Sequence, residues 1–546
     1  MKIKKPQPKR RLDRLVDQDC QKALDQMDRG DHEAALACLD AVLLTTPDHY
    51  LAGLNKGLCL SKLGRLKEAV RQLHTLYESF PQEVLLLKLC GLAYGEAGHF
   101  VAALQFLQRY TEAEPNDYEA WASMCQISSQ AGKDTNAVIY ATQALSLAPL
   151  NPDAYNNLGA TLLPLGRLDE AEQAFETTLA LKPNNYMALS NLGSLSHSRG
   201  EHEAAISYFE KALLLLDRSS EEYETLLYRS CFPLLGAGYL KEGWRRYEYG
   251  FVPIDAISRH PKRKFSKPRW SGEPLGDKRL LVWAEQGLGD ELQFYGELNE
   301  VRERCDNIIV ECAPRLVSLL ERSYPDIIVR ADRRDSAIYI QDFDTHIPAG
   351  SLAGMFRNDI DDFKKRRPYI KPDPEVAVDF SERLSRYAGK KLVGLSWRSG
   401  NVSARRAQHY LTLDVLAEIL TNPSYAVVNL QYGDCEDELL RAEAALGIQI
   451  VRWHDVNLKD DQEAVAALIS QLDVVLSPQS AVAQMTMALG VPLIVFGQPT
   501  WMSLGQEHYP WSNNVELITP NAGQELSTTV PRIVASLERP RPEDSA

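Results

Sequence analysis

The turn after one short apolar run carries residues that could perform acid–base chemistry. The run 279–283 leads into Ala-Glu-Gln-Gly-Leu-Gly-Asp, which ends at Asp290. Gly287 and Gly289 would let a ligand approach the backbone, and free amides at a helix start favour anions. A carboxylate at Asp290 could act as a general base, but Asp is also a good N-cap. On spacing alone, capping is the simpler interpretation.

A second apolar run, 391–397, continues into a glycine-bearing loop that contains Arg398 and Ser399. Arg405 and Arg406 follow closely. A guanidinium pairs with two phosphate oxygens at once, so these residues suit a diphosphate. Surface salt bridges are an equally simple interpretation. We assign Arg398, Ser399 and Gln431, the last residue of the next apolar run, to a nucleotide-binding site.

A third segment reads as strand, short turn and helix over 472–489. Ser480 can cap that helix, and its hydroxyl and the neighbouring amides would face a phosphate. We assign Gln479, Ser480, Ala481 and Gln484 to the same site. An aromatic loop, 501–511, follows the next apolar run.

Short β-branched runs alternate with helical patterns from about residue 276 onward. This alternation predicts parallel sheets with right-handed crossovers, in two Rossmann-like lobes at 276–375 and 388–537. Ligands bind beyond the carboxyl ends of such strands. The expected strands are 279–283, 307–312, 391–397, 425–431, 449–453, 472–477 and 492–496. The expected helices include 314–322, 413–420, 436–446, 462–471 and 481–489.

The first half of the chain repeats every 34 residues. A glycine between two helices, a small residue early in the second helix and a proline after it each keep this period. The glycines are Gly30, Gly64, Gly98, Gly132, Gly166 and Gly200. The alanines are Ala35, Ala69, Ala103, Ala137, Ala171 and Ala205, and the prolines are Pro47, Pro81, Pro115, Pro149 and Pro183.

These marks resemble the tetratricopeptide repeat. The resemblance predicts an α-solenoid over 15–250, with six regular repeats and a degenerate seventh pair after residue 220. The concave groove of such an array usually binds a peptide or protein. Asn55, Asn156, Asn157 and Asn191 are candidates for holding a peptide backbone, since an amide both donates and accepts. Ordinary surface polarity is the alternative for each of them.

Bulk properties exclude several classes of function. A net charge of −14 argues against nucleic-acid binding. No apolar run is long enough to cross a membrane, and the basic segment 1–14 lacks the apolar stretch of a secretory signal. Nine scattered cysteines fit reduced thiols in the cytoplasm, and the histidines lack metal-ligand spacing. The basic, proline-containing segment 251–275 is expected to be a linker running over the surface.

The region 270–537 resembles the bacterial heptosyltransferase-like glycosyltransferases, on the four segments described above. The resemblance implies a GT-B-type architecture and inverting transfer from a nucleotide-sugar, without a metal or other cofactor. It implies that Asp290 is the base, and that a protein in the repeat groove is the acceptor. Gln479, Ser480 and Gln484 depart from the Asp-Thr and His of that family. Two alternatives stay open: an interaction scaffold that has lost the chemistry, and a transferase acting on lipid-linked sugar.

Overall fold

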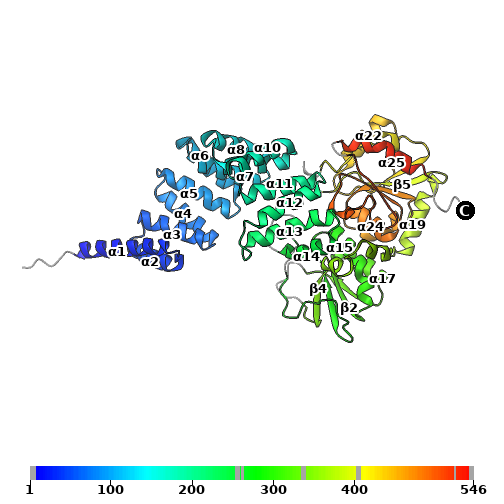
Figure 1. Ribbon diagram of the computed structural model, residues 1–546, viewed down its shortest axis with the longest axis horizontal. Helices are drawn as coiled ribbons and strands as arrows, with labels where there is room; N and C mark the ends of the chain where they lie inside the picture. Colours follow the sequence, from blue (N-terminus) through cyan, green and yellow to red (C-terminus); the bar gives the residue numbers. More distant parts are fainter. Residues whose placement is uncertain are drawn as a thin grey trace, which may run out of the picture. The chain divides into compact units, whose positions relative to one another are not determined.

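The computed structural model describes residues 8–251, 259, 263–333, 340–400, 407–521 and 524–539. The chain divides into two compact units, Met1–Pro183 and Asn184–Ala546. The division falls inside the repeat array and not at residue 250, where we expected the array to end. Figure 1 shows the helical hairpins of the first unit and the mixed architecture of the second.

The first unit is a series of helical hairpins, as the repeat period predicted. Each helix packs on the next one along the chain. The helices are α1 (Pro8–Asp28), α2 (His32–Thr45), α3 (Tyr50–Lys62), α4 (Leu66–Ser79), α5 (Val84–Glu96), α6 (Phe100–Ala113), α7 (Tyr118–Gln130), α8 (Asp134–Leu147), α9 (Pro152–Leu162), η1 (Leu163–Leu165) and α10 (Leu168–Leu181). Part of the expected basic tail, residues 8–14, belongs to α1.

The periodic residues have the roles that the sequence assigned to them. The six periodic glycines have φ between +67° and +79°, a left-handed conformation in which a Cβ is penalised. The six periodic alanines are fully buried, because the two helices of each hairpin approach closely at that point. The 34-residue pattern therefore predicts both the turn and the packing contact of each repeat.

The second unit begins with two further hairpins. Helices α11 (Tyr186–Ser198) and α12 (His202–Leu213) form the sixth regular repeat, and α13 (Glu221–Gly236) and α14 (Leu240–Tyr247) form the predicted degenerate pair. A short helix, η2 (Glu248–Phe251), follows them.

The first α/β lobe has a four-stranded parallel sheet in the order β3-β2-β1-β4. The strands expected at 279–283 and 307–312 are confirmed, whereas β3 and β4 were not predicted. Its elements are β1 (Arg279–Trp283), α15 (Leu288–Phe294), η3 (Tyr295–Glu297), α16 (Leu298–Arg302), β2 (Asn307–Cys312), η4 (Pro314–Leu316), α17 (Val317–Ser323), β3 (Ile328–Ala331), β4 (Thr345–Pro348), α18 (Ser351–Phe356) and η5 (Ile360–Lys365).

The second lobe has a five-stranded parallel sheet in the order β6-β5-β7-β8-β9. The strand expected at 449–453 is reduced to one parallel bridge between Val451 and Val428, which extends the order to the Rossmann pattern. The elements are α19 (Pro374–Leu384), η6 (Ser385–Tyr387), β5 (Lys391–Leu395), α21 (Ala417–Leu420), β6 (Tyr425–Asn429), α22 (Glu436–Leu446), α23 (Gln462–Ile469), β7 (Val474–Pro478), α24 (Ala481–Leu489), β8 (Leu493–Phe496), η7 (Trp501–Ser503), β9 (Val515–Ile518), η8 (Leu526–Thr529) and α25 (Val530–Leu537).

One hydrophobic core joins the last hairpin to both lobes. Trp244 and Tyr247 of α14 belong to the same buried cluster as Val282 of the first lobe and Trp511 of the second. Trp244 also donates a hydrogen bond of 2.8 Å from Nε1 to the carbonyl oxygen of Arg357. This shared core explains why the last hairpin belongs to the α/β unit.

Candidate functional site

The turn between β1 and α15 is held by buried polar contacts. Glu285 is buried and receives two bonds from Arg259, Nε to Oε2 at 2.8 Å and Nη2 to Oε1 at 2.5 Å. The amide of Gly350 donates to the same carboxylate at 2.8 Å. Gln286 has φ of +63°, and its Oε1 accepts a hydrogen bond of 2.9 Å from the hydroxyl of Tyr247.

Asp290 lies at the start of α15, half-buried, and caps the helix in a different way from the one expected. The helix begins at Leu288, so Gly287 and not Asp290 is the N-cap residue. The amide of Gly287 donates to Asp290 Oδ2 at 3.1 Å, which is the reciprocal half of a capping box. Burial raises the pKa of the Tyr247 hydroxyl, and the charge of Asp290 is among the groups that raise it further. The carboxylate therefore lies close to the last repeat hairpin.

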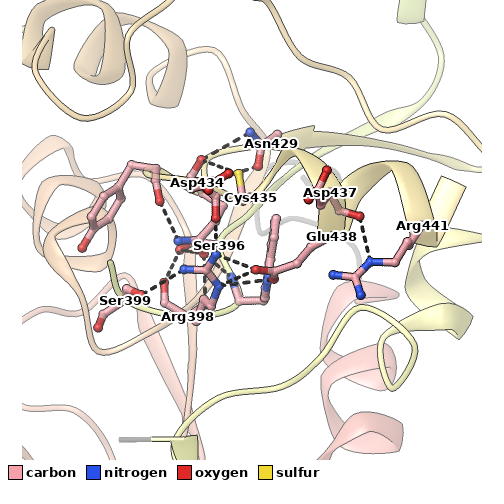
Figure 2. A network of polar contacts seen from close by, with 12 residues as sticks. Ser396, Arg398, Ser399, Asn429, Asp434, Cys435, Asp437, Glu438 and Arg441 are labelled. Carbon is pink, nitrogen blue, oxygen red and sulfur yellow. Dashed lines mark hydrogen bonds and ion pairs between the residues drawn. The ribbon is translucent and has the colours of Figure 1, made fainter. Parts of the chain in front are cut away.

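Arg398, in the loop after β5, is occupied by an intramolecular carboxylate. Its Nη2 and Nε bond Glu438 Oε1 at 2.6 and 3.0 Å, and Nη2 also donates to the carbonyl of Asp434 (Figure 2). The hydrogen bond with Glu438 raises the pKa of Arg398. Gln431 is buried, and its Oε1 accepts from the amides of Trp397 and Arg398 at 3.1 and 3.0 Å. Gln431 thus fixes the backbone at the start of this loop through two hydrogen bonds.

The other candidate residues of this loop are Ser399, Arg405 and Arg406. Ser399 shares a hydrogen bond of 2.6 Å with the hydroxyl of Tyr410. Arg405 and Arg406 lie outside the described residues.

The turn after β7 meets the start of α15. Ser480 is the N-cap of α24, and its hydroxyl lies 3.0 Å from that of Ser477. A Cβ built on Gly289 would lie 3.6 Å from the Cα of Ala481 and 3.8 Å from Cγ of Gln484. The structure therefore brings Gly289 close to Ala481 and Gln484.

A cavity of about 430 Å³ opens at the carboxyl ends of β5, β7 and β8. Ser399 and Gln479 line it, and Gln479 Oε1 accepts a hydrogen bond of 2.9 Å from Thr500. Its lining among the described residues contains no Lys, Arg, Asp or Glu. The other lining residues are His197, Ser198, Gln408, His409, Tyr410, Val495, Phe496, Gly497, Gln498, Pro499, Thr500, Trp501 and Leu517. Amides, hydroxyls and aromatic rings therefore offer hydrogen bonds and stacking without fixed charge.

The aromatic loop 501–511 joins the cavity to the last hairpin. Trp501 lines the cavity and lies 5.9 Å from Phe232 of α13, ring centre to ring centre. Trp511 is buried and donates from Nε1 to the carbonyl of Met502 at 2.9 Å. The loop is therefore mainly a packing contact with the repeats.

The expectation of a solvated surface linker at 251–275 is wrong for two of its arginines, whereas Lys264, Lys267 and Arg269 are exposed. Arg259 and Arg263 are buried, and Arg263 forms ion pairs with Glu311 and Asp332. Burial opposes the charge of Arg259, but Glu285 and Glu248 outweigh that effect and raise its pKa. These arginines neutralise acidic residues near the carboxyl ends of β1, β2 and β3.

The four asparagines proposed for peptide binding lie on the first helices of their hairpins. Asn55, Asn157 and Asn191 are half-buried. Asn156 is only 5% exposed, so our description of it as an exposed groove residue is wrong. It lies on the face of α9 that packs inside the repeat.

No helix within the described residues is long and apolar enough to cross a membrane. No group of three or more His, Cys, Asp or Glu side chains in the described ranges could hold a metal ion.

Sequence reasoning missed several residues of this region. Glu285 and Tyr247 lie close to the candidate turn at Gly287. Their contacts could not be predicted locally, because Arg259, which binds Glu285, is distant in sequence and Tyr247 belongs to a helix of the repeat array. His197 reaches the cavity only because α11 belongs to the α/β unit. The one available signal was Glu285 itself, an acidic residue directly after a buried strand.

The fold and these contacts define a tetratricopeptide repeat protein with a Rossmann-like α/β domain. Residues 20–84 and 150–213 match the tetratricopeptide repeat family. Protein FlbA of Caulobacter vibrioides is 30% identical over 452 residues, which cover 80% of this chain and 75% of FlbA. The chain therefore belongs to the family of Protein FlbA.

Two further similarities cover less of the chain. Human protein O-mannosyl-transferase TMTC1 is 25% identical over 216 residues, which are 33% of this chain and 24% of the human protein. The crystal structure of a tetratricopeptide repeat protein from Parabacteroides merdae is 17% identical and covers 44% of this chain and 95% of that one, with a TM-score of 0.40.

Proposed function

We propose that this protein is an inverting glycosyltransferase of GT-B-type architecture that moves a sugar from a nucleotide-sugar donor to a protein acceptor. The observation that carries the proposal is the cavity at the carboxyl ends of β5, β7 and β8. In open α/β sheets ligands bind at that edge, at the point where the strand order reverses, here between β5 and β7.

The lining of the cavity supports a sugar-containing ligand. Gln479 and Gln498 offer amides, Ser399 and Thr500 offer hydroxyls, and Trp501 offers an aromatic ring. These groups match the hydroxyls and apolar faces of a sugar or ribose. The donor diphosphate would lie at the first turn of α24, where free amides favour anions. Ser480 and the other residues of that turn would stabilise the leaving group, so the proposal includes no metal.

Asp290 is the proposed general base. Its carboxylate would take the proton of the acceptor hydroxyl as the oxygen bonds the anomeric carbon. The bond between that carbon and the diphosphate breaks, and the nucleoside diphosphate leaves with the bonding electrons. Support comes from the position of Gly289, the residue before Asp290, against Ala481 at the start of α24.

The acceptor is proposed to be a protein segment guided by the repeats. Tetratricopeptide repeats bind protein partners, and α11 supplies both Asn191 and two cavity residues, His197 and Ser198. A segment bound along α11 would therefore end at the cavity. Sugar transfer to protein is also the activity in the name of the human relative. We further propose a cytoplasmic location, in keeping with nine free cysteines.

A non-catalytic scaffold is the second candidate, and two contacts favour it. Glu438 already neutralises Arg398, so a diphosphate would have to compete with that ion pair. Asp290 already accepts a bond from Gly287, as a purely structural cap would. In this alternative the α/β unit would only support the repeats.

Replacing Asp290 separates the two candidates. Purified protein and its Asp290→Asn variant are assayed for nucleotide binding by calorimetry and for transfer or hydrolysis of nucleotide-sugars by mass spectrometry. We expect both to bind the nucleotide and the variant to lose turnover about a hundred- to ten-thousandfold, as for a general base. Ser399→Ala should instead weaken nucleotide binding. Full activity of Asp290→Asn, or a parent protein that neither binds nor turns over any nucleotide-sugar, would favour the scaffold.

A further inference from the structure

The turn that leads to Asp290 contains a backbone conformation that its residue type disfavours. Gln286 has φ of +63°, and among the described non-glycine residues only Leu504 shares a positive φ. The Cβ of an L-residue crowds the backbone in this region, so such a residue needs its surroundings to hold it in place. Gln286 stands one residue before the N-cap of α15, and its conformation therefore sets the direction in which that helix starts.

The last repeat helix supplies the contact that holds Gln286. The hydroxyl of Tyr247, the final residue of α14, donates to Gln286 Oε1 at 2.9 Å. Tyr247 is 2% exposed and Gln286 is half-buried, so the bond is only partly accessible to water. The guanidinium of Arg259 lies 4.5 Å from the centre of the Tyr247 ring while it binds Glu285, the residue before Gln286. The same small cluster thus fixes two successive residues of the turn.

The helix that carries Tyr247 is itself fixed to both lobes. Trp244, one turn earlier in α14, bonds Arg357 of the first lobe and packs 6.2 Å from Trp511 of the second, ring centre to ring centre. A Cβ placed on Gly238, in the turn before α14, would lie 3.3 Å from the carbonyl oxygen of Leu504, so this turn packs closely on the second lobe. These contacts restrain α14, and they therefore hold the Tyr247 hydroxyl in place beside the turn.

We propose that Tyr247 is a positioning residue for the transfer site, so that the terminal repeat hairpin completes the site as well as supporting it. By holding Gln286 in the left-handed region, Tyr247 places Gly287 and the first turn of α15, and with them the carboxylate of Asp290. The part of this inference that concerns turnover rests on the proposed function, whereas the part that concerns the turn does not.

The test removes one oxygen atom from α14. Tyr247→Phe keeps the ring and its packing but loses the bond to Gln286. Tyr239→Phe is the control, because it also removes one tyrosine hydroxyl from the same hairpin, one that donates to the carboxylate of Glu203 at 3.1 Å, without touching the turn. Hydrogen exchange of the full-length protein is followed by mass spectrometry in peptides that cover 284–294. We expect exchange there to become about five- to tenfold faster in Tyr247→Phe, the usual effect of one hydrogen bond, and to stay unchanged in Tyr239→Phe.

A second substitution asks whether the conformation of Gln286 is what matters. Glycine adopts a positive φ without penalty, so Gln286→Gly in the Tyr247→Phe background should restore slow exchange in 284–294. Nucleotide-sugar turnover should follow the same order: kcat about ten- to a hundredfold lower in Tyr247→Phe with an unchanged donor KM, and recovered in the double variant.

The outcomes separate this inference from the proposed function. Unchanged exchange in Tyr247→Phe, faster exchange throughout Asn184–Ala546, or no recovery in the double variant would each overturn the positioning role. If the parent protein shows no turnover, the proposed function fails, while the exchange pattern still decides the role of Tyr247.

Discussion

The two compact units of the chain are stabilised by different kinds of contact. In Met1–Pro183 each helix packs on the next along the chain, and the buried alanines recur at a fixed spacing. In Asn184–Ala546 the bond between Trp244 and Arg357 joins residues 113 positions apart. Two hairpins of the repeat pattern belong to this second unit. The difference teaches that a repeat can keep the sequence period of one unit while its contacts belong to the other.

Each unit contains an Arg–Glu ion pair held by two hydrogen bonds, and the two pairs differ in their exposure to solvent. Arg65 and Glu68 form a two-bond pair in the first unit, with side chains 40% and 51% exposed. Arg259 and Glu285 form the equivalent pair in the second unit, with both side chains 0% exposed. The two pairs consist of the same residue types, and they differ in how deeply their side chains are buried.

The largest expected effect comes from breaking the buried pair. Arg259→Met leaves the Glu285 carboxylate buried without its counter-ion, which costs about 3–5 kcal/mol. We expect this loss in the unfolding transition of Asn184–Ala546 alone, measured by urea denaturation with fluorescence and circular dichroism. Arg65→Met is the matched control and should change stability by about 0–1 kcal/mol. Equal effects of the two substitutions would contradict the account.

The next effect tests the division of the repeats. Gly159 and Gly193 occupy the same repeat position, and a Cβ on each would lie 2.6 Å from Phe175 and 3.0 Å from Phe209, respectively. Overpacking of this kind costs about 1–3 kcal/mol. Gly159→Ala should destabilise the first unit, whereas Gly193→Ala should destabilise the second, and by less. The account fails if both substitutions lower the same transition in urea.

A smaller effect concerns the cap of α15. Asp290→Ala removes the bond from the Gly287 amide and should destabilise the second unit by about 0.5–1.5 kcal/mol. Asp290→Asn retains an acceptor oxygen and should cost less. Thermal denaturation of both variants checks this order. An alanine variant as stable as the parent protein would mean that the capping bond contributes nothing.

The smallest effect is a dependence on pH at Glu438. Burial raises the pKa of this carboxyl, but bonds from Arg398 and Trp397 outweigh it, and the net pKa lies below the ordinary value. The stabilisation is therefore present above the pKa of the unfolded state and is lost as pH falls through the folded pKa. The stability difference between the parent and Glu438→Gln should shrink as urea denaturation is repeated from pH 6 down toward pH 3, about the range in which carboxyls titrate. A difference that grows toward low pH would contradict the assignment.

Much of the fold could be predicted from the sequence. The repeat period predicted the turn of each of the six regular hairpins, because a left-handed glycine and a fully buried alanine leave few alternatives at their positions. Strands β1 and β2 were predicted to the residue, because buried parallel strands are continuous apolar runs. Strands β3, β4 and β9 were missed. Each is four residues long, which is too short for a distinctive pattern, and β3 and β9 are also partly exposed.

The candidate site was less predictable, for a physical reason. Local patterns placed Gly289, Ala481 and Gln479 at sheet edges, and the structure has them there. The side chains that contact these sheet edges come from distant parts of the sequence. Glu438 neutralises Arg398, and Tyr247 of α14 bonds Gln286 in the turn before Asp290. Buried ion pairs such as Arg259–Glu285 leave only isolated charges in the sequence, which resemble solvated ones. The expectation of a solvated linker failed at Arg259 and Arg263 for that reason.

Native-state hydrogen exchange of the intact chain tests the central claim most directly, namely that α11–α14 belong to the α/β unit. Exchange is measured by mass spectrometry at increasing, sub-denaturing urea concentrations, and the opening free energy of each peptide is compared. The account predicts that peptides from 186–247 open together with those from 279–312 and separately from those of α9 and α10. Opening of 186–247 together with α9 and α10, while 279–312 stays closed, would contradict it.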